Sequence, residues 1–336
     1  MKKVLKVVGF AVLGLVGLIA AAVAYAGLTT HGRLQFPDTA APKLKAVSAP
    51  AVIEQGRYLV HGPAHCSQCH STDDRNHPEK VKDAALRGGL SFAMGPLGTR
   101  YAVNLTPHDT GIAKLSDEQL ARTIRTGVLH GGEISFFMRI AAANPSEEDT
   151  VAIISYLRSL QPVANQVPEG QWYLFGKVLM TYAFPKLEPR QGPAPKHVPA
   201  SDTPSLERGK YLANNLMKCI DCHSKVDMSK SFDPIEPLGG GSLPDPSHGD
   251  DDKDMEFVAP NLTSHATGIT GRMDEAAFVA RLRAGRAFKS SIMPWESFAA
   301  ATDADLKSVY MYLKSLPPVD NDVGPTYRRK GDRSGK

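Results

Sequence analysis

The sequence has few cysteines, and none of them is spare. Its 336 residues contain four cysteines, Cys66 with Cys69 and Cys219 with Cys222, so no thiol is left for a disulfide between distant segments. The chain also lacks a phosphate-binding glycine loop, a hydrolase nucleophile motif and any long alternation of apolar and polar residues. These absences argue against a P-loop enzyme and a fold of long strands. We expect no nucleic-acid partner, because a net charge of +4 is too small to indicate one.

Charged residues are missing between Lys6 and Arg33, and the apolar run 7–28 lies in this gap. Such a run can cross about 30 Å of hydrocarbon, and the three lysines before it keep the N-terminus in the cytoplasm. Its length favours an uncleaved anchor in the inner membrane. A cleaved signal peptide stays open, with Ala24-Tyr25-Ala26 as the cleavage site. The globular part would be in the periplasm in both cases, anchored in the first and soluble in the second.

The chain after residue 30 contains one pattern twice. Each copy has a G-R/K-Y-L block ten residues before a cysteine, an N-L-T…T-G-I block and a Y-L-R/K-S-L block. Blocks in one order at nearly one spacing indicate a duplication, and the period is far too long for a solenoid. The blocks begin at Gly56, Asn104 and Tyr156 in the first copy and at Gly209, Asn261 and Tyr312 in the second.

The duplication predicts the domain organisation. We call residues 51–163 the first repeat and residues 205–320 the second repeat, and we expect each to form a domain. The remaining segments are an anchor or signal segment at 1–30, a linker at 31–50, a proline-rich linker at 164–204 and a basic tail at 321–336, which we expect to be solvated. The apolar stretch 172–184 inside the second linker predicts a short helix in the groove between the domains. A surface for a partner protein or the membrane is the alternative.

Helix signals recur in both repeats. Ser116 with Gln119 forms a capping-box pattern, and Gly127 suits the end of that helix. Asp274 begins the equivalent helix of the second repeat. Ser146 and Thr302 are expected to cap the last helix of each repeat. The sequence therefore predicts a mostly α fold with extended loops.

The motif C-x-x-C-H occurs at 66–70 and at 219–223. Two thiols one helical turn apart can add to the two vinyl groups of a porphyrin, and the next residue can place an imidazole under its iron. A zinc ribbon would need closer pairs, a thioredoxin-like pair would need a βαβ pattern, and disulfides would not explain the histidines. We predict two covalently attached haem c groups. Their attachment residues are Cys66, Cys69, Cys219 and Cys222, and their axial histidines are His70 and His223.

Methionine opposite histidine is the usual arrangement for electron transfer. Met293 precedes Pro294, which keeps that loop extended, and Met138 holds the comparable place in the first repeat. The first haem cysteine lies 72 residues before Met138 and 74 before Met293. We predict both methionines as sixth ligands, with a gap-filling role in the core as the alternative. His130 and Met94 are the fallback ligands of the first haem.

With these residues in view, the chain resembles the class I cytochrome c family. Over residues 51–320 it is most similar to the cytochrome c subunits of membrane-bound alcohol and gluconate dehydrogenases. The resemblance implies two tandem class I cytochrome c domains after an N-terminal transmembrane helix. It also implies that the first and last helices of each domain cross at Gly56 and at Gly209. Those subunits usually carry three haems, whereas this chain has two C-x-x-C-H motifs.

The function expected from these features is electron transfer. A membrane-anchored carrier in the periplasm would accept electrons from a dehydrogenase or a quinol-oxidising complex and pass them to another cytochrome or an oxidase. The alternative is a haem enzyme, such as a di-haem peroxidase or a thiosulfate-oxidising cytochrome, with an open or displaceable site on the first haem. A redox sensor is a third class, but the sequence contains no signalling domain. The carrier is favoured over the enzyme.

Overall fold

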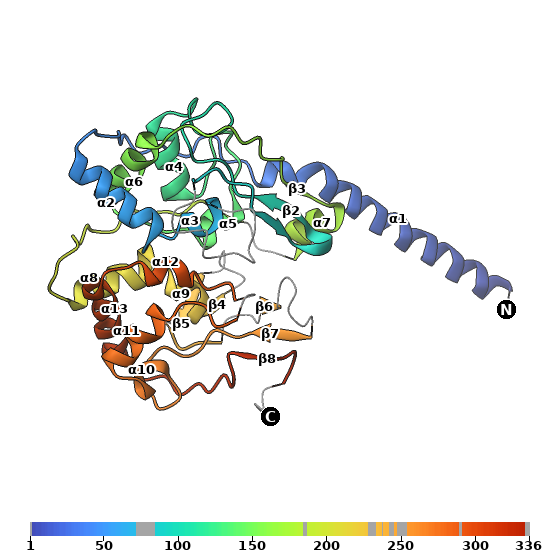
Figure 1. Cartoon of the computed structure of the whole chain (residues 1–336). Helices are drawn as coiled ribbons and strands as arrows, with labels where there is room; N and C mark the ends of the chain where they lie inside the picture. The colour runs from blue at the N-terminus through green and yellow to red at the C-terminus, as the bar shows by residue number, and fades with distance from the viewer. Residues whose placement is uncertain are drawn as a thin grey trace.

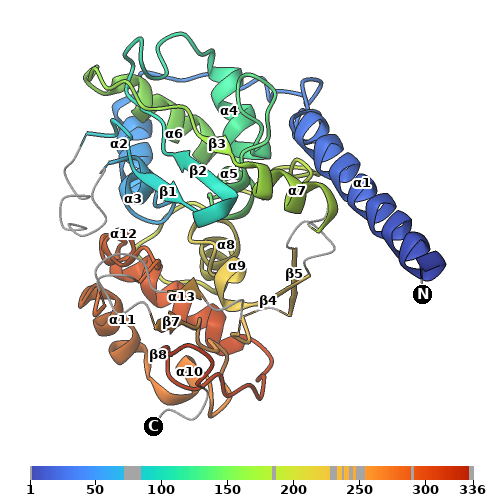
Figure 2. The ribbon, with the colours of Figure 1, turned by 90° about the vertical axis from the view of Figure 1, so that its right-hand side faces the viewer.

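The computed structural model describes residues 2–71, 85–183, 187–227, 233–236, 238–241, 245–246, 254–288 and 291–332. The two repeats form two stacked bodies, and a long N-terminal helix projects from the side of the first (Figure 1). A view turned by 90° shows the same arrangement (Figure 2). The architecture is mostly helical, as expected.

Short helices and loops make up the first repeat and its flanks. The N-terminal helix α1 is followed by α2, which carries the G-R-Y-L block, and by α3, which carries the first C-x-x-C-H motif. The elements are α1 (Lys2–Arg33), α2 (Pro50–His61), α3 (Ser67–His70), β1 (Ser91–Ala93), η2 (Gly95–Leu97), β2 (Gly98–Tyr101), α4 (Asp117–Thr126), α5 (Phe136–Ile140), α6 (Glu147–Ser159), β3 (Gln171–Trp172) and α7 (Leu174–Tyr182).

The second repeat follows the same order. Its G-K-Y-L helix continues through a π-helical turn into the helix of the second motif. The elements are α8 (Leu206–Tyr211), η3 (Leu212–Leu216), α9 (Cys219–His223), β4 (Lys225–Asp227), β5 (Asp233–Glu236), β6 (Asp245–Pro246), β7 (Met255–Phe257), α10 (Ile269–Arg272), α11 (Glu275–Arg283), α12 (Trp295–Ala299), α13 (Asp303–Ser315) and β8 (Tyr327–Arg329). The strands form small antiparallel sheets in the orders β1-β2-β3, β4-β5 and β6-β7-β8.

The predicted helix caps are confirmed. Ser116 and Gln119 form a complete capping box at the start of α4, which ends at Gly127 with φ +82°. Asp274 accepts a hydrogen bond from the Ala277 amide at the start of α11. The hydroxyls of Ser146 and Thr302 cap α6 and α13 in the same way. Local sequence therefore determines where these four helices begin.

Each repeat is built on a close crossing of its first and last helices. A Cβ placed on Gly56 of α2 would lie 1.9 Å from the Ala152 carbonyl oxygen of α6. A Cβ on Gly209 of α8 would lie 1.8 Å from the Ser308 carbonyl oxygen of α13. Only glycine allows backbones to approach this closely. The crossings implied by the sequence resemblance are thus present at both glycines.

The two repeats are joined by an exchange of equivalent hydrogen bonds. The Tyr58 hydroxyl of α2 donates to the Asp305 carboxylate of α13, at 2.6 Å, and accepts from the Thr302 amide. The Tyr211 hydroxyl of α8 donates to the Asp149 carboxylate of α6, also at 2.6 Å, and accepts from the Ser146 amide. Each tyrosine thus caps a helix of the opposite repeat. This is the pattern of contacts found in a two-fold symmetric dimer.

The surroundings of the two aspartates break this symmetry. Arg208 makes a buried, two-pronged ion pair with Asp305, at 2.8 and 2.9 Å. The equivalent position of the first repeat is Gln55. Asp149 instead has His197 3.7 Å away, and its Oδ1 atom accepts no hydrogen bond within the described residues. Asp149 therefore depends on Tyr211 more than Asp305 depends on Tyr58.

One expected contact of the linker is wrong. The predicted linker helix exists as α7. It packs on α1 and on the turn η2, and not in the groove between the repeats as expected. The hydroxyls of Thr30 and Thr181 lie 2.8 Å apart, and a Cβ on Gly176 would lie 2.0 Å from the Leu97 carbonyl oxygen. The threonine contact holds α7 beside α1, and the close approach at Gly176 holds it on η2. Phe184, the end of the expected stretch, is outside the described residues.

The C-terminal tail is also more ordered than expected. Residues 327–329 form β8, which pairs with β7. Arg328, one of the basic residues expected to be solvated, is buried and makes a 2.9 Å ion pair with Glu256. The strand pairing and this ion pair attach the tail to the second repeat.

We expect Tyr211→Phe to lower the free energy of unfolding more than Tyr58→Phe does. Tyr211→Phe leaves the buried Asp149 carboxylate without a hydrogen bond, which should cost about 3 kcal/mol of unfolding free energy. Tyr58→Phe should cost about 1 kcal/mol, because Asp305 keeps its ion pair with Arg208. Urea unfolding followed by circular dichroism measures both. Tyr101→Phe is the control, because no hydrogen bond of its hydroxyl is found among the described residues. Equal losses for the two variants would contradict the asymmetry.

Candidate haem-attachment sites

Each C-x-x-C-H motif begins immediately after a turn in the left-handed backbone region. His65, before Cys66, has φ +44°, and Lys218, before Cys219, has φ +53°. Non-glycine residues adopt this conformation at a cost of about 1–3 kcal/mol, and such strain is often found at functional sites. The turn separates the motif helix from the helix before it. Both motifs therefore lie on short helices of their own, α3 and α9.

The histidines of the two motifs make the same hydrogen bond. His70 Nδ1 donates to the Val103 carbonyl at 2.7 Å, and His223 Nδ1 donates to the Pro260 carbonyl at 2.9 Å. Burial lowers the pKa of both histidines, which favours the neutral imidazole. With Nδ1 occupied as a donor, Nε2 keeps its lone pair. This is the state in which a histidine binds iron, with its ring oriented by a second hydrogen bond.

The loops that supply these carbonyls are fixed by buried asparagines. The Asn104 side chain accepts from the Thr106 amide and hydroxyl and donates to the Val163 carbonyl and to Thr110. Asn261 makes the same four bonds in the second repeat, to Thr263, Val319 and Thr267. Each asparagine directly follows the residue whose carbonyl accepts from the motif histidine. The N-L-T block, which the sequence analysis used as evidence of duplication, therefore also positions the carbonyl that the motif histidine contacts.

The four cysteines, all within the described residues, form no disulfide with one another. Burial raises the pKa of Cys66 and of Cys219 to about 12, so these thiols are protonated at neutral pH. Each pair lies on a short helix that ends in a histidine with an available Nε2. These features fit covalent haem at both motifs, with His70 and His223 as iron ligands.

The two methionines lie in different local structures. Met293 comes just before α12 and packs against the main hydrophobic cluster, which Cys219 also contacts. Met138 lies inside α5, with its amide capped by Ser135. Of the fallback residues, His130 is exposed in a turn and Met94 is half-buried at the β1–β2 turn. Their roles as iron ligands stay predictions.

In each repeat an arginine contacts the backbone around the predicted methionine ligand. We call the residues around Met138 and around Met293 the methionine segments. Arg190, from the linker, donates to five backbone carbonyls that include Met138 and the carboxyl ends of α4 and α5. The acceptors are Ile124, Met138, Arg139, Ala142 and Ala143, at 2.6–3.4 Å. Burial lowers the pKa of Arg190 to about 10, so it is charged at neutral pH. A charged guanidinium stabilises the partial negative charge of helix carboxyl ends.

The second repeat uses its own arginine. Arg286 donates to the Met293 and Ser291 carbonyls and forms an ion pair with Glu296 at 2.9 Å. The sequence analysis missed both arginines. Arg190 has no repeat counterpart in the sequence, so the duplication gave no signal for it.

The interface between the repeats adjoins both candidate sites. Gln68, inside the first motif, donates to Glu296 of α12 at 3.3 Å, and the His65 and Phe298 rings are 5.8 Å apart. α12 follows Met293 directly, so the first motif lies beside the methionine segment of the second repeat. On the other side, the Asn144 amide donates to the Asn215 carbonyl at 2.7 Å.

No family model matches the chain. Several curated proteins with similar sequences are cytochrome c subunits of dehydrogenases. The cytochrome c subunit of the quinone-dependent alcohol dehydrogenase of Gluconacetobacter polyoxogenes is 27% identical over 286 residues, which cover 82% of this chain and 58% of that protein. The fructose dehydrogenase cytochrome subunit of Gluconobacter japonicus is 25% identical, with 79% and 52% covered. The gluconate 2-dehydrogenase cytochrome c subunit of Pantoea cypripedii is 28% identical, with 80% and 60% covered.

The chain thus spans between half and two thirds of the length of these relatives. Over most of its own length it is similar to cytochrome c subunits of dehydrogenases, as the sequence resemblance had indicated. That similarity implies covalently bound haem c and is consistent with electron transfer.

We expect Asn104→Ala and Asn261→Ala each to lower the free energy of unfolding by about 3 kcal/mol, since each leaves several buried polar groups without partners. Each should also loosen the orientation of the axial histidine of its own repeat and change the reduction potential of only one haem. Spectroelectrochemical titration and urea unfolding test this. Asn214→Ala is the control, because that side chain donates only to the Tyr312 hydroxyl within the described structure. Wild-type potentials in both variants would contradict the positioning role.

Proposed function

We propose that this chain is a di-haem c-type cytochrome that transfers electrons for a membrane-bound dehydrogenase. It would hold one haem c in each repeat, through Cys66, Cys69 and His70 and through Cys219, Cys222 and His223. Helix α1 would anchor it in the inner membrane, with both repeats in the periplasm. Its partners would be the dehydrogenase and a second redox protein, either another cytochrome or an oxidase.

The observation that carries this proposal is that both motif histidines donate the same hydrogen bond, from Nδ1 to a backbone carbonyl. In each repeat an asparagine-fixed loop offers a carbonyl to Nδ1, at 2.7 and 2.9 Å, and leaves Nε2 for the metal. A structural disulfide or a reactive cysteine pair does not require an oriented histidine whose Nε2 can bind a metal. The dehydrogenase partner is supported by the names of the three relatives.

The membrane anchor is supported by α1 itself. Residues 6–33 form a helix long and apolar enough to cross a membrane, and none of its apolar window is buried inside the protein. At its far end, Ala26, the last residue of the candidate cleavage site, is fully buried. Tyr182 also donates to the Ala22 carbonyl just before that site. The contacts between α1 and α7 therefore favour a retained anchor over a cleaved signal.

The protein's own residues would position the haems and tune them. Bound haem supplies reversible one-electron chemistry. The Nδ1–H hydrogen bonds set the basicity of the axial imidazoles, Arg190 and Arg286 hold the methionine segments, and the reciprocal tyrosine contacts hold the two sites side by side. Rigid placement of the haem ligands lowers the reorganisation energy that accompanies the change of charge on the iron during electron transfer.

One observation keeps the enzyme alternative in view for the first haem. Met138 lies within the helix α5 and outside the main hydrophobic cluster, whereas Met293 precedes its helix and packs on that cluster. A first haem iron that neither Met138 nor a fallback residue binds would have an open position.

We expect the purified full chain to contain two haems and to show the near-infrared methionine-to-iron band of two low-spin sites. Met138→Ala and Met293→Ala should each remove about half of that band, because each removes one of two axial ligands. Reduced wild-type protein should not bind carbon monoxide. A high-spin first haem that binds carbon monoxide in the wild type would reject the carrier and favour the enzyme. A haem count other than two would reject the di-haem assignment.

We expect Arg190→Ala to reduce the near-infrared band by about half, as Met138→Ala does, because Met138 loses the contact that holds its backbone. The variant should also lose about 3 kcal/mol of unfolding free energy, since five carbonyls lose their donor. Arg57→Ala is the matched control. Its exposed pair with Glu54, at 2.6 Å, should contribute no more than about 0.5 kcal/mol. Destabilisation with a full band would show that Arg190 does not position Met138.

A further inference from the structure

Helix α7 is attached to α1 through a specific set of contacts. Its Thr181 hydroxyl lies 2.8 Å from that of Thr30, and its Tyr182 hydroxyl donates to the Ala22 carbonyl at 2.8 Å. The inner side of α7 is buried at Gly176 and Met180, and Met180 joins Leu34 in a small hydrophobic cluster. α7 is therefore fixed along the last part of α1.

Helix α7 also exposes large apolar and aromatic side chains beside α1. Leu174, Phe175 and Tyr182 are each 54% exposed, and Tyr173 just before the helix is 43% exposed. The helix contains one lysine and no acidic residue. Apolar and tyrosine side chains on one face, with a basic residue, are typical of a helix that lies in a membrane interface.

The level of α7 along α1 coincides with the end of a membrane span. The apolar run 7–28 is about 33 Å long at 1.5 Å per residue, close to the hydrocarbon thickness of a bilayer. The contacts of α7 on α1 extend from Ala22 to Thr30. If the run crosses the bilayer, α7 lies where hydrocarbon gives way to headgroups on the outer side.

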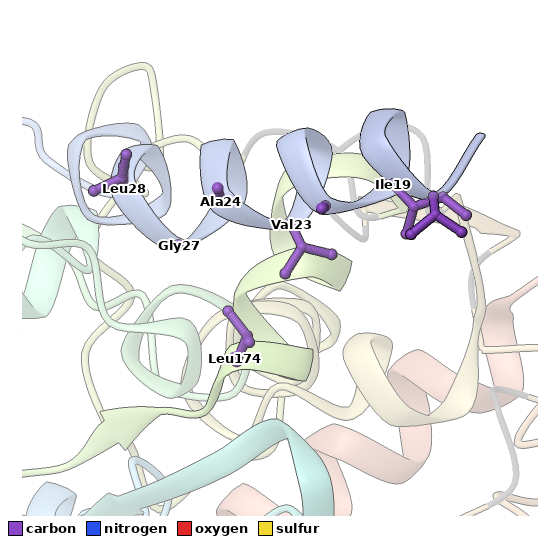
Figure 3. Close-up of a pocket in the computed structure, with 8 residues that line it drawn as sticks. Ile19, Val23, Ala24, Gly27, Leu28 and Leu174 are labelled. Atoms are coloured by element: carbon purple, nitrogen blue, oxygen red, sulfur yellow. The ribbon is translucent and has the colours of Figure 1, made fainter. Parts of the chain in front are cut away.

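A groove between the two helices opens toward the projecting part of α1. It has a volume of about 650 Å³ and is lined almost entirely by α1, including Ile19, Val23 and Gly27, with Leu174 as the contribution of α7 (Figure 3). The N-terminal part of α1 extends away from both repeats (Figure 1). The groove is therefore continuous with the surface of α1 that would face acyl chains.

We propose that α7 is a second membrane-contacting element, whose exposed side chains Leu174, Phe175 and Tyr182 lie in the boundary between headgroups and acyl chains of the bilayer that α1 crosses. Lipid fills the groove between α7 and α1. This inference rests on the membrane anchoring by α1 in the proposed function. Two attached elements, one across the bilayer and one along its surface, fix the orientation of the first repeat relative to the membrane, which a single helix does not.

The test places the full-length holoprotein in liposomes of phosphatidylethanolamine and phosphatidylglycerol that contain an acyl-chain-confined carbene photolabel. Mass spectrometry then maps the labelled residues. We expect label on α1 and on Leu174, Phe175 or Tyr182, at least ten times the level on Leu206. Leu206 is the matched internal control, because it is 47% exposed on the second repeat, away from α1. Phe175→Glu should reduce labelling of α7 several-fold and leave that of α1 unchanged.

The other outcomes separate the two proposals. Label on α1 with none on α7 above the Leu206 level overturns the placement of α7 and leaves the anchor intact. No label on α1 overturns the anchor itself, and the placement of α7 with it. Label on α7 in liposomes but not in native membranes also overturns the proposal, because it assigns this face to a protein partner.

Discussion

The reciprocal bonds between Tyr58 and Asp305 and between Tyr211 and Asp149 are the constraint on which the arrangement of the whole molecule depends. Each tyrosine comes from the helix that precedes a C-x-x-C-H motif, and each aspartate lies in the first turn of the last helix of the other repeat. The glycine crossings fix those two helices within each repeat. The same two helices of each repeat therefore determine the fold of that repeat and the position of its neighbour.

Much of this could be predicted from the sequence, because it depends on local chemistry. The four helix caps and the histidines next to cysteine pairs are short-range patterns, and the structure contains each cap. The glycine crossings join residues far apart in the sequence; the family resemblance implied them, and the structure contains both. The Tyr–Asp exchange could not be predicted, since its partners are 247 and 62 residues apart and neither residue type indicates a partner. Duplication could have given a hint, because both residues recur at matching positions.

The errors have physical causes. Apolar character in residues 172–184 correctly indicated a buried helix face but could not say what buries it. Thr30 and Thr181 hold the helix on α1, and the close approach at Gly176 holds it on η2. The basic tail was expected in solvent because charged residues usually lie there, yet Glu256 provides Arg328 with a buried partner. Arg190 escaped notice because a lone arginine in a proline-rich linker has no distinguishing pattern. Its role is visible only once five carbonyls converge on it.

The near-symmetric interface has a consequence for the origin of the chain. A surface that contacts its own counterpart is self-complementary, so a protein of one repeat already has what it needs to pair with an identical copy. Fusion of two such copies frees the halves to diverge while their contact persists. The two repeats have diverged in this way at equivalent positions. The first repeat has Gln55 where the second has Arg208, and Met138 lies in a helix whereas Met293 lies in a loop. In the proposed di-haem protein, two identical sites would offer an electron no preferred direction, whereas two unequal sites would give it a downhill path.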